Sequence, residues 1–161
     1  MHQVDIRTRP SLTVAALDHV GSYQDIGRSF EILYEWFAAH HSVDPQARVV
    51  GIFLDDPSIV PEAQLRSKAC VEISPSDTVV LSAPVSRLEI AGGTFAVLTH
   101  VGPYTQLHSA YKFLYGEWLP TAPYQATDAP AHEIYLNTPR DTPPAELITE
   151  IWLPIQSATA K

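Results

Sequence analysis

A carboxylate set among aromatic residues is the feature of this sequence best suited to do chemistry. Glu133 lies two residues before Tyr135, and side chains two apart on a strand point to the same face. Trp152 lies in a segment expected to pair beside Glu133, and Phe53 corresponds to Tyr135 in an internal repeat described below. Aromatic rings offer cation–π attraction and stacking area, and an acid supplies a counter-charge. The combination favours a site for flat cationic or polar aromatic ligands.

The surroundings expected for Glu133 would also alter its acid–base chemistry. Burial among aromatic rings disfavours the charged carboxylate and therefore raises the pKa of this group. A carboxyl with a raised pKa can act as a proton donor or acceptor. An exposed position on the strand is an alternative that the pattern leaves open, because charged residues are seldom buried without a partner.

Other chemistries find little support in the residue pattern. The histidines show no ligand spacing with cysteine or with a carboxylate motif, so we expect no metal site. No glycine-rich phosphate loop and no serine nucleophile elbow is present, and we expect no cofactor. His19 and His100 are expected to be structural, Cys70 to be a small buried apolar residue, and Tyr23 and Tyr104 to pack in the core or at its rim.

The elements that position these residues emerge from an internal repeat. Residues 14–23 resemble residues 95–104, which lie 81 residues later, and the similarity continues into the following segments. Residues 51–57 resemble residues 133–139 at an offset of 82. Equivalent pairs include His19/His100, Gly21/Gly102, Tyr23/Tyr104, Phe30/Tyr111, Leu33/Leu114 and Cys70/Trp152. The length of the match indicates a duplicated fold.

Each half reads as strand, helix, strand, strand. Apolar runs at 14–17 and 95–98 favour strands, and apolar residues then recur at helical spacing up to Phe37 and Trp118. Later strands are expected at 49–54, 69–73, 132–136 and 148–154, and a linker is expected from Ser74 to about Val85. Residues 87–90 are expected to lead the second half, as residues 4–6 lead the first.

The pattern therefore predicts one α+β domain over residues 1–161, with repeats at about 1–75 and 85–156. We expect an antiparallel sheet with two helices on one face, the opposite concave face free for a ligand, and a ligand cleft between the halves. Comparison of the halves singles out one pair of residues. Gly51 in the first half corresponds to Glu133 in the second, so the acid is absent from the first half.

Composition limits the classes of function. With 161 residues, of which 45% are apolar, the chain suits one globular domain. Ten basic and eighteen acidic residues give a net charge of −8, and no basic cluster occurs, so we expect no direct binding to nucleic acid. No signal peptide or membrane span is visible, and with a single cysteine the cytoplasm is the expected location.

The sequence resembles the GyrI-like effector-binding domain family, which includes the DNA gyrase inhibitory protein SbmC and the ligand-binding domains of regulators such as BmrR and Rob. The resemblance covers nearly the whole chain. It is carried by His100–Tyr104, Gly51–Pro57, His132–Asn137, Thr142–Leu147 and Thr149–Pro154.

The resemblance implies a duplicated strand–helix–strand–strand fold and makes Glu133 the ligand-binding acid. It implies that Phe53, Tyr111, Tyr135 and Trp152 are the aromatic residues of the site. Three functions remain open, namely a stand-alone binder that senses or sequesters cationic or aromatic compounds, a hydrolase, and a protein that acts on DNA gyrase. The hydrolase would open cyclopropane-containing toxins with Glu133 and with Trp152 or Tyr135. Monomer and dimer both remain open.

Overall fold

The computed structural model describes residues 2–40, 46–74 and 81–158, and its fold belongs to the α+β class. The chain divides into two units of structure. Unit 1 comprises Met1–Pro10 and Gly92–Lys161, and unit 2 comprises Ser11–Ala91. Each unit contributes its own set of antiparallel strands and its own apolar core, so the two are described in turn.

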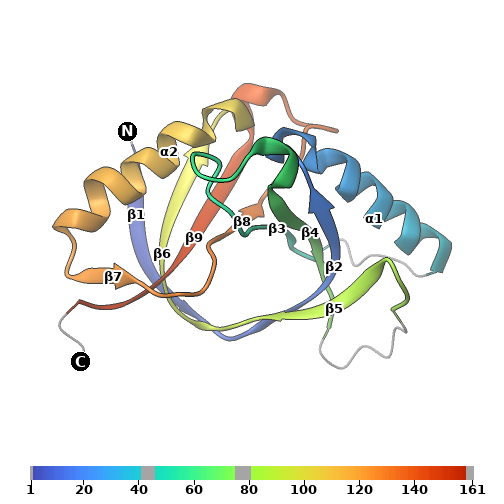
Figure 1. Cartoon of the computed structure of the whole chain (residues 1–161), viewed down its shortest axis with the longest axis horizontal. Coiled ribbons are helices and arrows are strands. Elements are labelled where there is room, and N and C mark those ends of the chain that lie inside the picture. Colours follow the sequence, from blue (N-terminus) through green and yellow to red (C-terminus); the bar gives the residue numbers. More distant parts are fainter. Residues whose placement is uncertain (1, 41–45, 75–80, 159–161) are drawn as a thin grey trace. The chain divides into compact units, whose positions relative to one another are not determined.

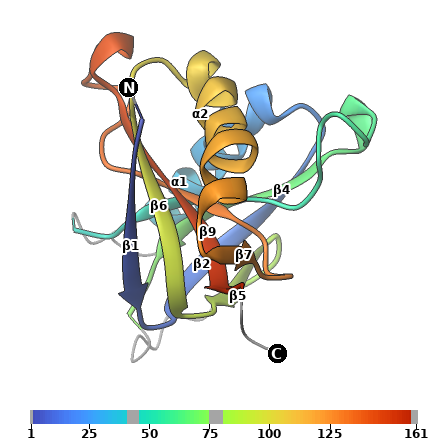
Figure 2. The same ribbon diagram turned by 90° about the vertical axis from the view of Figure 1, so that its left-hand side faces the viewer.

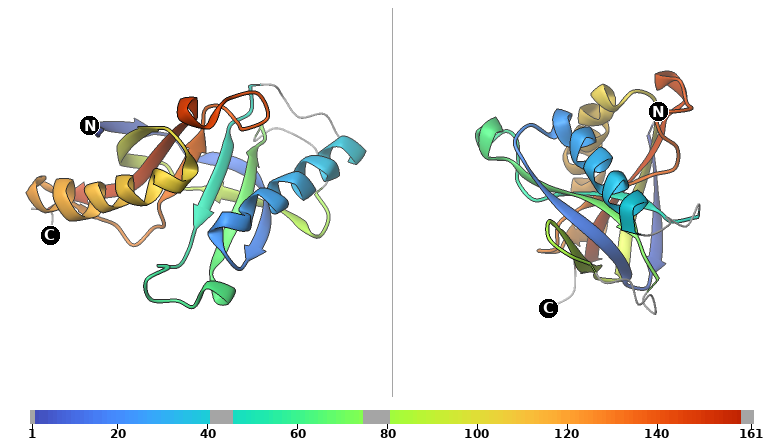
Figure 3. Two further views of the ribbon diagram at one scale, coloured as in Figure 1. Left: turned by 90° about the horizontal axis from the view of Figure 1, so that it is seen from above. Right: turned by 90° about the vertical axis from the view of Figure 1, so that its right-hand side faces the viewer.

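Unit 2 contains α1 (Ile26–His40), which follows the short 3-10 helix η1 (Tyr23–Asp25). Its strands are β2 (Leu12–Val20), β3 (Val49–Phe53), β4 (Arg66–Glu72) and β5 (Val85–Ile90), with η2 (Glu62–Gln64) before β4. They pair antiparallel in the order β3, β4, β2, β5. Helix α1 packs on β2 and β4 (Figure 3). There Leu33 and Phe37 are buried against Leu17 and Val71.

Unit 1 repeats this arrangement with additions. Strands β1 (Gln3–Arg9), β6 (Gly93–Val101), β9 (Ile148–Ser157) and β8 (His132–Tyr135) pair antiparallel in that order, and the short strand β7 (Tyr124–Ala126) pairs with the end of β9. Helix α2 (Leu107–Phe113) runs over β6 and β9 (Figures 1 and 2). The remaining helical segments are η3 (Tyr104–Gln106), the π-helix η4 (Leu114–Trp118), η5 (Leu119–Thr121) and η6 (Pro144–Glu146).

Two equivalent glycine turns show how closely the units match. Gly21 and Gly102 have φ angles of 118° and 139°, a region that L-residues with a side chain rarely adopt. Each directs the chain from a strand into a 3-10 turn and then into the helix. The Gly21 N–H donates to the Leu65 carbonyl at 2.8 Å, and the Gly102 N–H donates to the Leu147 carbonyl at 2.8 Å. The predicted strand–helix–strand–strand duplication is confirmed.

The leading strands pair differently from the expectation. Residues 87–90 form part of β5, but β5 pairs with β2 of unit 2, whereas β1 pairs with β6 of unit 1. The two leading segments are therefore exchanged with respect to the repeat. Sequence similarity identifies equivalent segments, but the partner of an edge strand depends on the path of the chain between them. Residues 75–80 of the expected linker lie outside the described residues.

The helical run of unit 1 ends where its prolines predict. It continues from α2 through η4 and η5 and stops at Thr121, between Pro120 and Pro123. Strand β7, which follows it, was not expected from the sequence. None of the helices in the described part of the chain is both long and apolar enough to cross a membrane.

Candidate functional site: a buried carboxyl held by two tyrosines

Glu133 lies on β8 and is almost fully buried, with 4% of its surface exposed. Its cross-strand partner is Ile151 of β9, and residues directly opposite each other on paired strands share a face. Ile151 packs in the core that α2 covers, together with Ala110 and Leu114. The carboxyl of Glu133 is therefore on the helix-covered face of the unit 1 sheet.

Two phenols hold the carboxyl. The Tyr111 hydroxyl, on α2, donates to Oε2 of Glu133 at 2.6 Å, and the Tyr135 hydroxyl, on β8, donates to Oε1 at 2.7 Å. Such short distances are typical of hydrogen bonds to an ionised acceptor. None of the ion pairs found among the described residues involves Glu133. The site thus offers hydrogen-bond donors to the acid but no cation.

Burial sets the protonation chemistry of this cluster. Loss of hydration raises the pKa of Glu133, and the hydrogen bonds from Tyr111 and Tyr135 offset part of that effect. The pKa of Tyr135 lies well above its ordinary value, because the hydroxyl is buried and faces the charge of Glu133. Of the two positions that the sequence leaves open for Glu133, the structure has the buried one. Tyr135 stays protonated and remains a donor.

Further aromatic rings adjoin the two phenols. The Tyr104 ring meets the Tyr135 ring edge-on, with centroids 5.7 Å apart and an interplanar angle of 62°. The Tyr115 ring stacks on Tyr111 at 6.4 Å and 11°. The acid is therefore bordered by aromatic surface from β8, α2 and the turn before α2. Neither Tyr104 nor Tyr115 was expected to belong to the site.

The position of Glu133 corrects one expectation about the sheet. The sequence placed the helices on one face and the ligand on the opposite face, but Tyr111 of α2 reaches the carboxyl directly. Strand alternation correctly puts Glu133 and Tyr135 on a common face. It does not reveal which face the helix covers, because both faces of β8 carry buried residues, Ile134 on one and Glu133 on the other.

Trp152 does not join this cluster. Its strand pairs beside β8 as expected, but its cross-strand partner is His132, one residue away from Glu133. An offset of one residue moves a side chain to the other face of a sheet. There Trp152 stacks on His132 at 6.2 Å, and its Nε1–H donates to Glu150 at 3.1 Å. Trp152 therefore does not face the Glu133 carboxyl, and its predicted role toward a ligand stays a prediction.

A second polar cluster surrounds Trp152 on that other face. The Arg9 guanidinium lies 4.6 Å from the Trp152 ring and 4.9 Å from the Phe95 ring, and it donates to Nε2 of His132 at 3.0 Å. Burial and the Arg9 charge lower the pKa of His132 to about 3. His132 is therefore neutral at physiological pH and carries its proton on Nδ1, since Nε2 accepts the bond from Arg9.

Phe53 belongs to unit 2, where its ring packs edge-on against Tyr23 at 4.8 Å. Its role toward a ligand stays a prediction, as does the cleft expected between the halves. The positions of unit 2 that are equivalent to the site have lost every polar group. They carry Phe30 in place of Tyr111, Gly51 in place of Glu133 and Phe53 in place of Tyr135.

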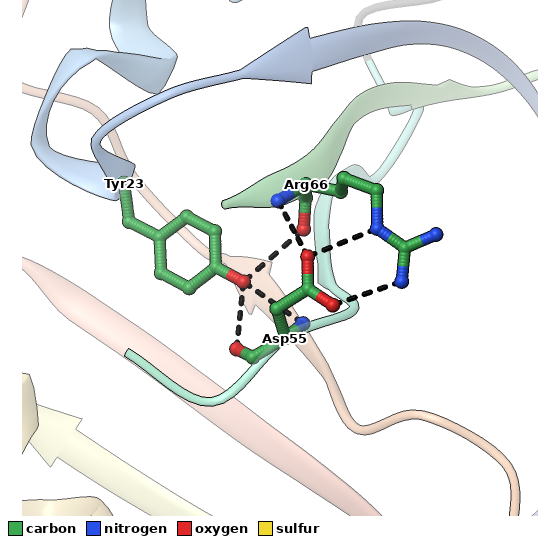
Figure 4. Close-up of polar contacts among 3 residues, drawn as sticks. All are labelled: Tyr23, Asp55 and Arg66. Carbon is green, nitrogen blue, oxygen red and sulfur yellow. Dashed lines mark hydrogen bonds and ion pairs between the residues drawn. The ribbon is translucent and has the colours of Figure 1, made fainter. Parts of the chain in front are cut away.

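Unit 2 instead places a polar network at the base of its β3–β4 loop, where β3 ends and β4 begins (Figure 4). The Arg66 side chain donates to both carboxylate oxygens of Asp55, at 2.8 and 3.0 Å, and the Arg66 N–H donates to the same carboxylate at 2.8 Å. The Tyr23 hydroxyl donates to the Asp55 carbonyl at 2.7 Å and accepts from the Asp55 N–H at 3.0 Å. This tyrosine thereby fastens the loop.

No group of three or more metal-ligating side chains comes together within the part of the chain that the structure describes. A shallow hollow of about 330 Å³ opens at the β1–β6 end of unit 1. It is lined by Thr8, Arg9, Pro10, Gly93 and Thr94, and none of the predicted site residues borders it.

Known proteins resemble this chain over most of its length. It is 26% identical to the probable transcriptional regulator YgiV of Escherichia coli K12, covering 94% of this chain and 95% of that protein. It is 27% identical to a DNA gyrase inhibitor of Escherichia fergusonii, covering 83% of this chain and 86% of that protein.

A solved structure shares the fold. The C-terminal domain of EcmrR superposes with a TM-score of 0.83 at 20% identity, covering 98% of this chain and 99% of that domain. This chain spans 58% of the EcmrR chain in its complex with DNA. Residues 2–156 match the family described as the GyrI-like small molecule binding domain, which confirms the resemblance noted in the sequence. This chain is a member of the GyrI-like small molecule binding domain family.

Proposed function

We propose that Glu133 is the anionic group that binds a small organic cation carrying aromatic rings. The observation that carries the proposal is a carboxyl buried to 4% exposure, with two phenols bound to it and no ion pair among the described residues. A buried acid without a cationic partner is costly to ionise. A cationic ligand would remove that cost by supplying the missing charge.

The two tyrosines do not use the full hydrogen-bonding capacity of the Glu133 carboxylate. A carboxylate accepts about four hydrogen bonds, and Tyr111 and Tyr135 each occupy one position on a different oxygen. They fix the orientation of the carboxyl, while the rings of Tyr104 and Tyr115 add aromatic surface next to the two phenols. Aromatic faces attract cations and stack on flat ligands, so both parts of the site favour the same chemical class.

Binding of a cation is coupled to loss of a proton from Glu133. Because burial raises the pKa of Glu133, part of the protein carries the neutral acid at mildly acidic pH. A cation binds the ionised form, so its affinity falls as the pH drops through the pKa of Glu133. Such a site suits sensing or sequestration of cationic compounds, which is the function we assign to the chain.

The other two functions have weaker support. Hydrolysis of a strained electrophile would need a group that stabilises developing charge beside Glu133, and Trp152 lies on the other face of the sheet. Tyr135 is the remaining candidate for that role. Action on DNA gyrase has the printed name of one relative and the acidic composition in its favour. Both stay predictions, and lack of turnover or unchanged supercoiling would remove them.

The test is binding of tetraphenylphosphonium, a permanent cation with four phenyl rings and no hydrogen-bonding atom, measured by isothermal titration calorimetry. We expect Glu133→Gln to weaken binding more than tenfold at neutral pH. The matched control is Glu150→Gln, which removes the same charge from the neighbouring strand β9. Glu150 lies on the other face, bound to Arg7 and Trp152, so its variant should bind within twofold of the wild type. Equal affinity of Glu133→Gln and wild type would contradict the proposal.

A further inference from the structure

The equivalent tyrosines Tyr23 and Tyr104 differ in what their hydroxyls do. The Tyr23 hydroxyl contacts three backbone groups, namely the Asp55 N–H at 3.0 Å, the Asp55 carbonyl at 2.7 Å and the Arg66 carbonyl at 3.1 Å. Among the described residues, the Tyr104 hydroxyl makes no hydrogen bond with the protein. Two residues at the same place in the repeat thus have different tasks.

In unit 2 the Tyr23 hydroxyl stabilises the β3–β4 loop, whereas in unit 1 a different side chain stabilises the equivalent β8–β9 loop. Asn137 occupies the position of Asp55, and its amide oxygen accepts the Ile148 N–H at 2.8 Å while its amide nitrogen donates to the Glu146 carbonyl at 3.1 Å. The loop therefore needs no hydroxyl from Tyr104. The phenol group is retained although the structural role of its counterpart is absent.

The Tyr104 side chain is directed toward the Glu133 cluster. It is partly buried, and its ring packs edge-on against Tyr135, whose hydroxyl is bound to Glu133. Burial and the charge of Glu133 both raise the pKa of Tyr104. The hydroxyl is consequently protonated at physiological pH and can donate a hydrogen bond.

We propose that Tyr104 is a specificity-determining residue of the Glu133 site, whose hydroxyl donates a hydrogen bond to an oxygen atom of the ligand. The inference rests on the proposed function and narrows its ligand class. The preferred ligand is an organic cation that also carries a carbonyl or ether oxygen. Glu133 binds the positive charge, Tyr111 and Tyr135 hold Glu133, and Tyr104 selects the polar substituent.

The test compares tetraphenylphosphonium with the three positional isomers of (acetylphenyl)triphenylphosphonium, which add one carbonyl oxygen at different places on a ring. Calorimetry gives their affinities for the wild type and for Tyr104→Phe. We expect Tyr104→Phe to bind tetraphenylphosphonium within twofold of the wild type and to lose about fivefold in affinity for at least one acetyl isomer, the typical range of one hydrogen bond. The matched control Tyr23→Phe should leave all four affinities within twofold.

Two outcomes would overturn the inference. The first concerns the affinity of each acetyl isomer relative to that of tetraphenylphosphonium. If this ratio is the same in Tyr104→Phe and in the wild type for every isomer, the inference is wrong. The other is independent of any ligand. It is the pKa of Tyr104, measured by ¹³C NMR on protein whose tyrosines are labelled at Cζ. This pKa should fall in Glu133→Gln because a neighbouring negative charge is lost. An unchanged pKa would show that Tyr104 does not lie close to Glu133. If the wild type bound none of the four cations, the proposed function itself would fail.

Discussion

Unit 1 and unit 2 share one scaffold but differ sharply at one pair of equivalent strands, β8 and β3. On β8 of unit 1, Glu133 is buried beneath α2 and is held by two phenols. The equivalent positions of unit 2 hold residues without a hydroxyl or a carboxyl, namely Phe30, Gly51 and Phe53. The acid and its two donors are present together in one unit and absent together from the other.

This difference indicates that the three residues act as a set. A buried carboxyl without hydrogen-bond donors is strongly unfavourable. A buried phenol without a partner loses its hydrogen bonds to water and gains none in the protein. Removing the acid therefore also removes the reason for the hydroxyls, and phenylalanine is then the better residue. Unit 2 shows which residues occupy these three positions when the acid is absent, namely two phenylalanines and a glycine.

The largest expected effect comes from moving the acid into unit 2. Gly51 is buried on β3, so Gly51→Glu places a carboxyl at a position that has phenyl rings in place of the two phenols. We expect the free energy of unfolding to fall by about 3 kcal/mol relative to the wild type, measured by urea denaturation. Gly51→Ala controls for the added volume and should cost less.

The same variant can sharpen the comparison. Adding Phe30→Tyr and Phe53→Tyr restores the two hydroxyls that unit 1 supplies, and we expect part of the lost stability to return. A triple variant no more stable than Gly51→Glu would mean that the donors do not support the acid. A Gly51→Glu protein as stable as Gly51→Ala would refute the proposed cost of the buried charge.

The pH dependence of stability provides the next test. The pKa of Glu133 is raised in the folded protein, so its contribution to stability is fully present below the unfolded pKa. That contribution is lost as the pH rises from the unfolded pKa through the folded pKa. Over this pH range the free energy of unfolding falls by at most about 1.4 kcal/mol for each pH unit. Glu133→Gln lacks this loss and should become the more stable protein at neutral pH in thermal melts. Parallel pH profiles for the two proteins would contradict the raised pKa.

A smaller difference is expected between the two equivalent tyrosines. Tyr23→Phe removes the hydroxyl that fastens the β3–β4 loop and should lower the free energy of unfolding by about 1 kcal/mol. Tyr104→Phe removes a hydroxyl without a hydrogen bond among the described residues and should change it by less than about 0.5 kcal/mol. Urea denaturation of both variants gives the comparison, and equal losses would contradict the different tasks assigned to them.

The smallest effect is expected for the phenols that hold the acid. Tyr111→Phe removes one hydrogen bond to the ionised carboxyl, so the pKa of Glu133 should rise further and tetraphenylphosphonium should bind about threefold more weakly at neutral pH. Tyr135→Phe should behave similarly. Lowering the pH should increase the difference in tetraphenylphosphonium affinity between the variant and the wild type, because a larger fraction of the variant then carries the neutral acid. An affinity unchanged at every pH would exclude this support role.

Much of the fold could be predicted because the chain contains its elements twice. The glycines at 21 and 102 and the shared helical spacing identify equivalent turns and helices without any other sequence. The exchange of β1 and β5 could not be predicted in this way, since similarity between segments says nothing about which strands pair. Strand β7 has no counterpart in the first half and gives no repeat signal.

The site was predictable only in part, for the same reason. The contrast between Gly51 and Glu133 marked the acid, and strand alternation correctly placed Tyr135 beside it. Trp152 was misplaced because strand register was unknown, and a shift of one residue reverses the face. The separate task of Tyr104 depends on Asn137 replacing Asp55 in the loop, a substitution whose effect appears only in the hydrogen bonds.

The most direct test of the central claim is the pKa of the Glu133 carboxyl, measured by ¹³C NMR with and without tetraphenylphosphonium. We predict a pKa above the ordinary glutamate value in the free protein, because burial outweighs the hydrogen bonds from Tyr111 and Tyr135. Saturation with tetraphenylphosphonium should lower this pKa, since the cation stabilises the ionised acid. A pKa that stays unchanged while tetraphenylphosphonium binds would show that the cation lies elsewhere and would contradict the proposed role of Glu133.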